Sequence, residues 1–124
     1  MNISDCLIII PTYNEKENVQ KMIETVLSIS ERFDILIVED GSPDGTADIV
    51  KEMMTKSSNR VHILERKGKL GLGTAYIAGF KWALERHYEF IFEMDCDFSH
   101  NPFDLLRLLK ACEEGADLSV GSRY

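Results

Sequence analysis

The sequence predicts an α/β fold: a three-layer α/β/α arrangement with a mostly parallel, twisted sheet. Short apolar runs rich in β-branched residues alternate with longer amphipathic segments, which is the pattern of βαβ units. The runs are apolar almost throughout, as expected of strands that helices cover on both faces. Polar residues gather directly after these runs, where ligands bind in open α/β sheets.

Each element follows from a local pattern. The first helix has apolar residues at helical spacing (Val19, Met22, Ile23, Val26 and Leu27). The segment "GSPDGT" is typical of a turn, and Pro102 suits the first position of the last helix. In order, the predicted strands are 6–11, 34–40, 61–64, 89–95 and the start of a fifth in 117–124. The predicted helices are 16–30, 47–57, 71–87 and 103–115.

Composition limits the class of protein. The 124 residues are 44% hydrophobic, which suits one domain over 1–124 with its own core. The net charge is −7, without a cluster of lysine or arginine, so nucleic acid is not expected as a partner. No apolar run approaches the length of a membrane span, and no signal peptide is visible. The three cysteines form no CxxC pair, which disfavours a disulfide framework or a zinc site. A reduced, cytoplasmic setting is expected.

Four groups of polar residues follow predicted strands: "PTYNE", "EDGSPDG", "DCDFSH" and "GSRY". Within "DCDFSH", Asp95 and Asp97 are two residues apart, so in an extended segment both carboxylates point the same way. Such carboxylates repel each other unless a cation neutralises them, and Mg²⁺ or Mn²⁺ prefers oxygen ligands of this kind. The spacing alone leaves open two surface acids, with Asp97 capping the next turn.

Five blocks together resemble the inverting nucleotide-sugar glycosyltransferases of family 2: "IIIPTYNEKENV", "ILIVEDGSPDGTADIV", "KLGLGTAYIAGFKWA", "EMDCDFSHNP" and "SVGSRY". They stand in the family's order and cover nearly the whole chain. The chain is most similar to members that act on dolichyl phosphate and bacterial polyprenyl phosphates. The resemblance implies the GT-A, Rossmann-like form of the predicted fold, as a nucleotide-binding domain truncated at its C-terminus, because relatives continue well past "GSRY".

The resemblance also implies roles for residues near the first two strands. Pro11, Tyr13 and Glu15 line the nucleoside pocket, and Asp40 contacts the nucleoside with Val38 beside it. The plainer interpretation is that Pro11 ends a strand and that Asn14 or Glu15 begins a helix. The family often has Asp where Glu39 stands, which is a conservative difference.

Further roles are implied near the last two strands. Asp95 and Asp97 hold Mg²⁺ or Mn²⁺ and the sugar diphosphate, with Asp97 in a catalytic role, and the backbone of Cys96 faces the nucleotide while its thiol is buried. Arg123, also catalytic, binds phosphate of the lipid acceptor, as the arginine fork can. Ser99 stands where some relatives have a third metal ligand. His100 is a poor match to a hard cation.

The glycine-rich segment "RKGKLGLGTA" is neither a GxGxxG dinucleotide loop nor a P-loop, because the order of its glycines and its ending differ from both. The resemblance places this segment near the substrate, with Lys67 or Lys69 near the diphosphate.

The implied reaction is transfer of a sugar, mannose from GDP-mannose, to a polyprenyl or dolichyl phosphate with inversion. The chain would be the donor- and metal-binding half, act at the cytoplasmic face of a membrane, and self-associate through an uncovered sheet edge. Two alternatives stay open: a UDP-sugar-dependent transferase with a glycan acceptor, and a nucleotide-binding fragment without turnover.

Overall fold

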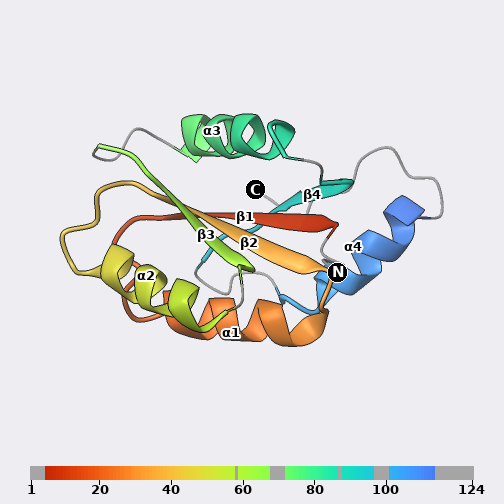
Figure 1. Cartoon of the computed structure of the whole chain (residues 1–124), viewed down its shortest axis with the longest axis horizontal. Coiled ribbons are helices and arrows are strands. Elements are labelled where there is room, and N and C mark those ends of the chain that lie inside the picture. Colours follow the sequence, from red (N-terminus) through yellow and green to blue (C-terminus); the bar gives the residue numbers. More distant parts are fainter. Residues whose placement is uncertain (1–4, 58, 68–71, 87, 97–100, 114–124) are drawn as a thin grey trace.

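A computed structural model describes residues 5–57, 59–67, 72–86, 88–96 and 101–113. Strands and helices alternate along the chain, as the sequence predicts (Figure 1). In order, the elements are β1 (Cys6–Thr12), α1 (Val19–Ile29), β2 (Phe33–Glu39), α2 (Thr46–Lys56), β3 (Val61–Glu65), α3 (Leu72–Leu84), β4 (Phe90–Glu93) and α4 (Asp104–Glu113). The predicted fifth strand in 117–124 lies outside the described residues.

The described strands form a four-stranded sheet in the order β3-β2-β1-β4. Every neighbouring pair is parallel, and β1 pairs with β2 along its full length, from Cys6 opposite Phe33 to Thr12 opposite Glu39. The predicted parallel α/β sheet is therefore confirmed. All carboxyl ends lie at one edge, where the loops after β1 and β2 run side by side at the left of Figure 1.

One boundary differs from the plainer interpretation of "PTYNE". Helix α1 begins at Val19, not at Asn14 or Glu15. Asn14 has a left-handed φ of 55°, and the amides of Glu15 and Lys16 donate to Thr46 Oγ1 and Asp44 Oδ2 across the neighbouring loop. Because the left-handed backbone of Asn14 is incompatible with a right-handed helix, the helix cannot begin there, and these two bonds hold the segment that precedes α1 against the neighbouring loop.

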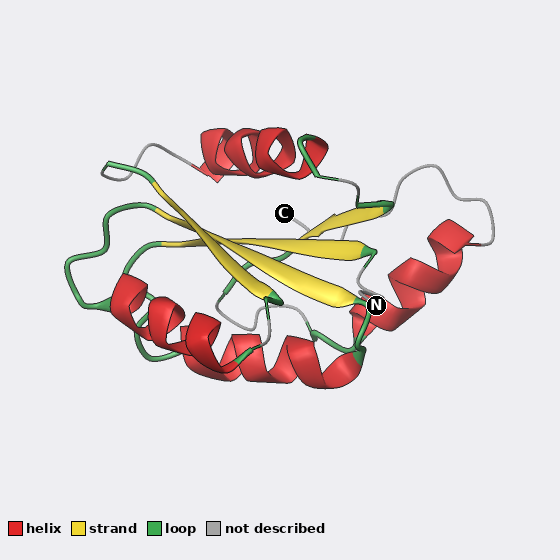
Figure 2. Cartoon of the chain, viewed as in Figure 1, coloured by secondary structure: helices red, strands yellow, loops and turns green. Residues whose placement is uncertain are grey.

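Two apolar layers sandwich the sheet. Residues at alternating strand positions point to opposite faces, so Ile8 and Ile35 pack with α1, α2 and α4, while Ile9 and Leu36 pack with α3. Figure 2 shows α3 on one side of the sheet, with α1 and α2 on the other. The three-layer arrangement is confirmed.

Helix α3 approaches the sheet closely. A Cβ built on Gly79 would lie 2.7 Å from Ile9 Cγ2, so only glycine fits without movement of the isoleucine. Ala75 and Ala83, on the same side of the helix, are also buried. Small residues thus set the distance between α3 and β1.

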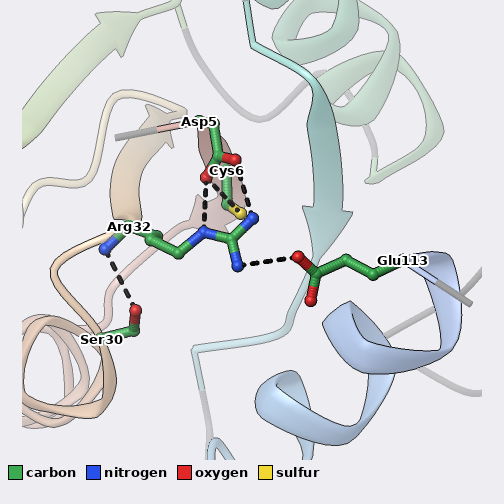
Figure 3. Close-up of polar contacts among 5 residues, drawn as sticks. All are labelled: Asp5, Cys6, Ser30, Arg32 and Glu113. Carbon is green, nitrogen blue, oxygen red and sulfur yellow. Dashed lines mark hydrogen bonds and ion pairs between the residues drawn. The ribbon is translucent and has the colours of Figure 1, made fainter. Parts of the chain in front are cut away.

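An ion-pair cluster lies at the amino end of β1, away from the polar edge (Figure 3). Arg32 donates to Asp5 through Nε at 2.9 Å and Nη2 at 2.7 Å, and to Glu113 of α4 through Nη1 at 3.0 Å. The Arg32 guanidinium lowers the pKa of Asp5, whereas burial raises the pKa of the neighbouring Cys6 thiol. The cluster fastens the α1–β2 connection and the end of α4 to the start of β1.

In the portion of the chain that the structure describes, no helix has both the length and the apolar character needed to cross a membrane.

Candidate functional site

The site lies where β1, β2 and β4 end, on the face of the sheet that α3 covers. Val38 belongs to the apolar layer of that face, and Pro11 stands opposite it in register. Asp40 follows β2, and Asp95 follows β4. Asp40 contacts Arg66, which directly follows β3, and Asp95 contacts Tyr76 of α3. The fold therefore brings together four of the sequence-predicted residues at one edge.

Asp40 is held by Arg66, which sequence analysis did not single out. Asp40 is only 5% exposed. Arg66 Nε donates to its Oδ1 at 2.6 Å and Nη2 donates to its Oδ2 at 2.8 Å, which is the strong fork geometry. Arg66 Nη1 also donates to Thr74 Oγ1 of α3 at 3.0 Å. The ion pair thereby ties the ends of β2 and β3 to the start of α3.

Asp95 is reached by Tyr76, a second residue that sequence analysis passed over. The Tyr76 hydroxyl, on the inner side of α3, donates to Asp95 Oδ1 at 3.1 Å. Glu93, the last residue of β4, has a raised pKa, first because partial burial disfavours its charged form and then because the Asp95 carboxylate repels its charge. This corner of the site thus holds two neighbouring carboxyl groups and a phenolic donor.

Hydrogen bonds from side chains connect the ends of β1 and β2 and the loops that follow them. Thr12 Oγ1 donates to Glu39 Oε1 at 3.0 Å, and the amide of Asn14 donates to Ser42 Oγ at 2.8 Å. Farther along, Asp44 accepts the hydroxyl and the amide of Thr46. The Thr46 contact, above all, lowers the pKa of Asp44. "GSPDGT" is a turn, as predicted, and it braces the loop that carries Tyr13 and Glu15.

The remaining predicted residues are exposed, buried or outside the described part of the chain. Tyr13 is 37% exposed beside this braced loop, where a ligand can reach it. The Cys96 side chain is buried in the layer of α1, α2 and α4, as the prediction of a buried thiol required, so only its backbone is available to the site. Lys67 is exposed. Outside the described residues lie Lys69, Asp97, Ser99, His100 and Arg123.

The described residues meet part of the requirement for a divalent cation. Asp95 supplies carboxylate oxygens, the donor type that Mg²⁺ and Mn²⁺ prefer, and the carboxyl group of Glu93 lies near enough to interact with it. Within 5–57, 59–67, 72–86, 88–96 and 101–113, no group of three or more His, Cys, Asp or Glu side chains has the geometry to hold a metal ion. Asp95 fits as one ligand of such an ion, and its predicted partner Asp97 lies outside the described residues.

Comparison with known proteins decides the family. Residues 7–124 match the family described as "Glycosyl transferase family 2". The chain belongs to glycosyl transferase family 2. The family resemblance that the five sequence blocks indicated is therefore confirmed.

According to their names, three curated relatives of this family 2 chain act on prenyl phosphates. It is 50% identical over 118 residues to a polyprenol monophosphomannose synthase of Mycolicibacterium smegmatis, which covers 95% of the chain and 44% of the relative. It is 48% identical to an undecaprenyl-phosphate mannosyltransferase of Micrococcus luteus (94% and 47%). It is 34% identical to a dolichol-phosphate mannosyltransferase of Pyrococcus furiosus (94% and 32%). The chain thus spans less than half the length of these relatives.

Solved structures show the same fold. The mannosyltransferase PcManGT of Pyrobaculum calidifontis, in complex with GDP-Man and Mn²⁺, superposes with a TM-score of 0.68 at 19% identity, over 82% of this family 2 chain and 30% of that protein. S. aureus TarS in complex with UDP-GlcNAc superposes with a TM-score of 0.68 at 21% identity, over 89% and 31%. At these identities the likeness concerns the fold, and the predicted GT-A class is confirmed.

Arg66 and Tyr76 carried weak signals in the sequence of this family 2 chain. Arg66 lies just beyond the third predicted strand and directly follows β3, so it lies at the same edge as Asp40. Tyr76 is next to Ala75, on the helix side that the small residues mark as buried, where a hydroxyl needs a partner. Neither signal identified Asp40 as the partner of Arg66 or Asp95 as the partner of Tyr76, because each pair forms between residues of separate elements.

Proposed function

We propose that this chain is the donor- and metal-binding part of an inverting glycosyltransferase that transfers mannose from GDP-mannose to a polyprenyl or dolichyl phosphate. The observation that carries the proposal is the convergence of Asp40 and Asp95 at one sheet edge, on the face where Arg66 and Tyr76 hold them. The names of the curated relatives support the sugar and the acceptor. The chain shares with them the region that contains both acids.

The nucleoside half of the site is assigned to β1 and β2. Pro11, Tyr13 and Glu15 line it from the first loop, with Val38 and Asp40 from the second strand. Asp40 is a buried acceptor, which suits recognition of base or ribose donors, since a polar group that is buried in a complex needs a partner. The braced loops keep Tyr13 accessible next to it.

The diphosphate half is assigned to the end of β4. Asp95 and Asp97 would hold Mg²⁺ or Mn²⁺, and the Tyr76 hydroxyl would fix the orientation of the Asp95 carboxylate. A bound divalent ion would offset the charge that develops on the leaving diphosphate. Cys96 would contribute its backbone only, because its side chain is turned into the core. Arg123 is assigned to the acceptor phosphate, which the arginine fork matches.

The proposed transfer does not need a general base among these residues. A phosphate acceptor is already anionic near neutral pH, so it needs no general base, whereas a sugar hydroxyl would. The described part of the site places Asp95 beside Tyr76 and Glu93. We assign Asp95 to metal binding and do not assign it to proton transfer.

Calorimetric titration tests this proposal. GDP-mannose should bind the chain in Mn²⁺ more tightly than in EDTA, and more tightly than a UDP-sugar does. Asp95→Asn or Asp97→Asn should remove the gain from Mn²⁺, while the matched control Asp48→Asn, at an exposed position of α2, should keep it. Equal affinities in Mn²⁺ and EDTA would contradict the metal site, and a preference for UDP-sugars would favour the alternative transferase.

A transfer assay tests the acceptor. We expect the isolated chain to bind the donor without forming a lipid-linked sugar, because the described site contains only donor-side residues. A chain extended to the length of the curated relatives should form mannosyl phosphoryl polyprenol at the cytoplasmic face of the membrane. Transfer by 1–124 alone would instead place the acceptor site within these residues.

Self-association is a separate expectation. In the described sheet β3 and β4 are the outer strands, and exposed strand edges invite pairing between copies. Sedimentation of the isolated chain at increasing concentration should reveal a dimer that the full-length protein does not form. A monomer at all concentrations would rule this out.

A further inference from the structure

Two adjacent acids at the end of β2 point to opposite faces of the sheet. Asp40 lies on the α3 face, bound by Arg66. Glu39 lies on the other face, where it is 1% exposed and bonded to Thr12. Alternation along a strand requires this division. Glu39 is therefore excluded from the proposed donor site although it adjoins a residue of that site.

The Glu39 carboxylate joins the two loops that border the nucleoside half. Oε1 accepts from Thr12 Oγ1 at 3.0 Å, at the end of β1. Oε2 accepts from the amide of Ser42 at 2.7 Å, and Oε1 also accepts from the Ser42 hydroxyl. A buried carboxylate is costly unless hydrogen bonds satisfy it, and here one donor at the end of β1 and two donors in the loop after β2 do so.

The connection continues from Ser42 to the first loop. The amide of Asn14 donates to Ser42 Oγ at 2.8 Å, and Asn14 has a left-handed φ of 55°, a conformation that asparagine tolerates better than most residues. Asn14 stands between Tyr13 and Glu15. The chain of contacts from Glu39 through Ser42 thus ends at the backbone that presents both residues.

We propose that Glu39 is a positioning residue, which holds the first loop in register with Asp40 so that both sides of the nucleoside half form one site. This inference rests on the proposed function, because it assumes that Tyr13, Glu15 and Asp40 bind the nucleoside. Glu39 does so without contacting the donor. Its carboxylate matters because both oxygens accept, whereas an amide offers only one acceptor atom.

The first test needs no ligand. Exchange of the Asn14 and Ser42 backbone amides is followed by NMR in the full chain. In Glu39→Gln and Ser42→Ala the Asn14 amide should exchange about tenfold faster, as expected on loss of a hydrogen bond to a charged network. The control is Glu65→Gln. Glu65 is opposite Glu39 in the register of β2 and β3, but its side chain is exposed, so this substitution should leave the exchange rates of both amides unchanged. Unchanged Asn14 exchange in both test variants would overturn the proposed connection.

The second test separates positioning from stability. For Glu39→Gln and Thr12→Val, the Kd of GDP measured in EDTA should rise about tenfold, which is the loss of affinity expected when one hydrogen bond is removed. The further gain on adding Mn²⁺ should stay the same, because the diphosphate half is untouched. Glu39→Asp, which keeps the carboxylate, should restore most of the affinity. A lower melting temperature with an unchanged Kd would mean that Glu39 only stabilises the fold, and would overturn the proposal.

The two tests also separate this inference from the proposed function. If the wild-type chain binds no nucleotide, the proposed function fails, and with it the role of Glu39 toward a donor. The exchange measurement would then still decide whether Glu39 orders the two loops.

Discussion

Arg66 holds Asp40 through two parallel hydrogen bonds, from Nε to Oδ1 at 2.6 Å and from Nη2 to Oδ2 at 2.8 Å. The pair links the ends of β2 and β3 at the sheet edge where the polar residues gather. A residue proposed to recognise the nucleoside is therefore itself fixed in place by the protein. The geometry of the fork, and not charge alone, determines its orientation.

Arg66→Lys should weaken nucleoside binding while the fold is retained. Lysine keeps the positive charge but loses the planar fork, so Asp40 is less well oriented, and the Kd of GDP should rise about tenfold by calorimetry. Arg86→Lys is the matched control, because Arg86 is exposed and stacks on Trp82. An equal loss of affinity in both variants would mean that overall charge, and not the fork, is responsible.

Tyr76→Phe should reduce the contribution of Mn²⁺ to donor binding. The variant keeps the ring and removes the hydroxyl that donates to Asp95 Oδ1 at 3.1 Å. The gain in affinity on adding Mn²⁺ should fall by about threefold to tenfold, as expected for one hydrogen bond. Binding in EDTA should not change. The control is Tyr88→Phe, because Tyr88 lies at the opposite end of the sheet, where it is bonded to Asp34. Tyr13→Phe is unsuitable as a control, since Tyr13 belongs to the proposed nucleoside half.

Gly79→Ala should destabilise the fold, whereas Gly73→Ala should not. The new Cβ at Gly79 would meet Ile9 at 2.7 Å, while the Cβ at Gly73 would meet nothing within 4 Å. Overpacking of this kind costs about 1–3 kcal/mol, which urea unfolding can measure. Ile9→Val should recover part of the loss in Gly79→Ala. If Gly73→Ala were equally destabilising, the close approach of α3 to β1 would not be the cause.

Arg32→Gln should lower stability at neutral pH but not in acid. The Arg32 guanidinium lowers the pKa of Asp5 in the fold, so its contribution is present above the unfolded pKa of about 4 and is lost as pH falls through the lower folded value. Because the pair is partly exposed, the difference in unfolding free energy should be about 1 kcal/mol at most.

Urea unfolding between pH 7 and pH 2 measures this difference for wild type and variant. The two curves should converge at the acid end. The control Lys56→Gln breaks a more exposed pair with Glu52 within α2 and should give a smaller difference. A gap for Arg32→Gln that persists at pH 2 would mean that its packing, rather than its charge, stabilises the start of β1.

Local patterns were enough for the elements and for one edge of the site. Alternation of apolar strands and amphipathic helices predicted β1 to β4 and the four helices that the structure describes. The position of Asp40 and Asp95 after their strands placed them at the same edge, because parallel strands end together. The start of α1 was predicted too early, since Asn14 has a left-handed backbone and the segment after it is held against another loop by Thr46 and Asp44.

The sequence by itself determined the fold class, the family and the edge at which the acids lie, because each depends on the order and spacing of residues along the chain. Only the tertiary structure decided the partners: Arg66 for Asp40, Tyr76 for Asp95, and Thr12 for Glu39. These contacts join residues 19 to 27 positions apart. No local propensity encodes such pairs, because they form only when the strand register and the approach of α3 bring the side chains together.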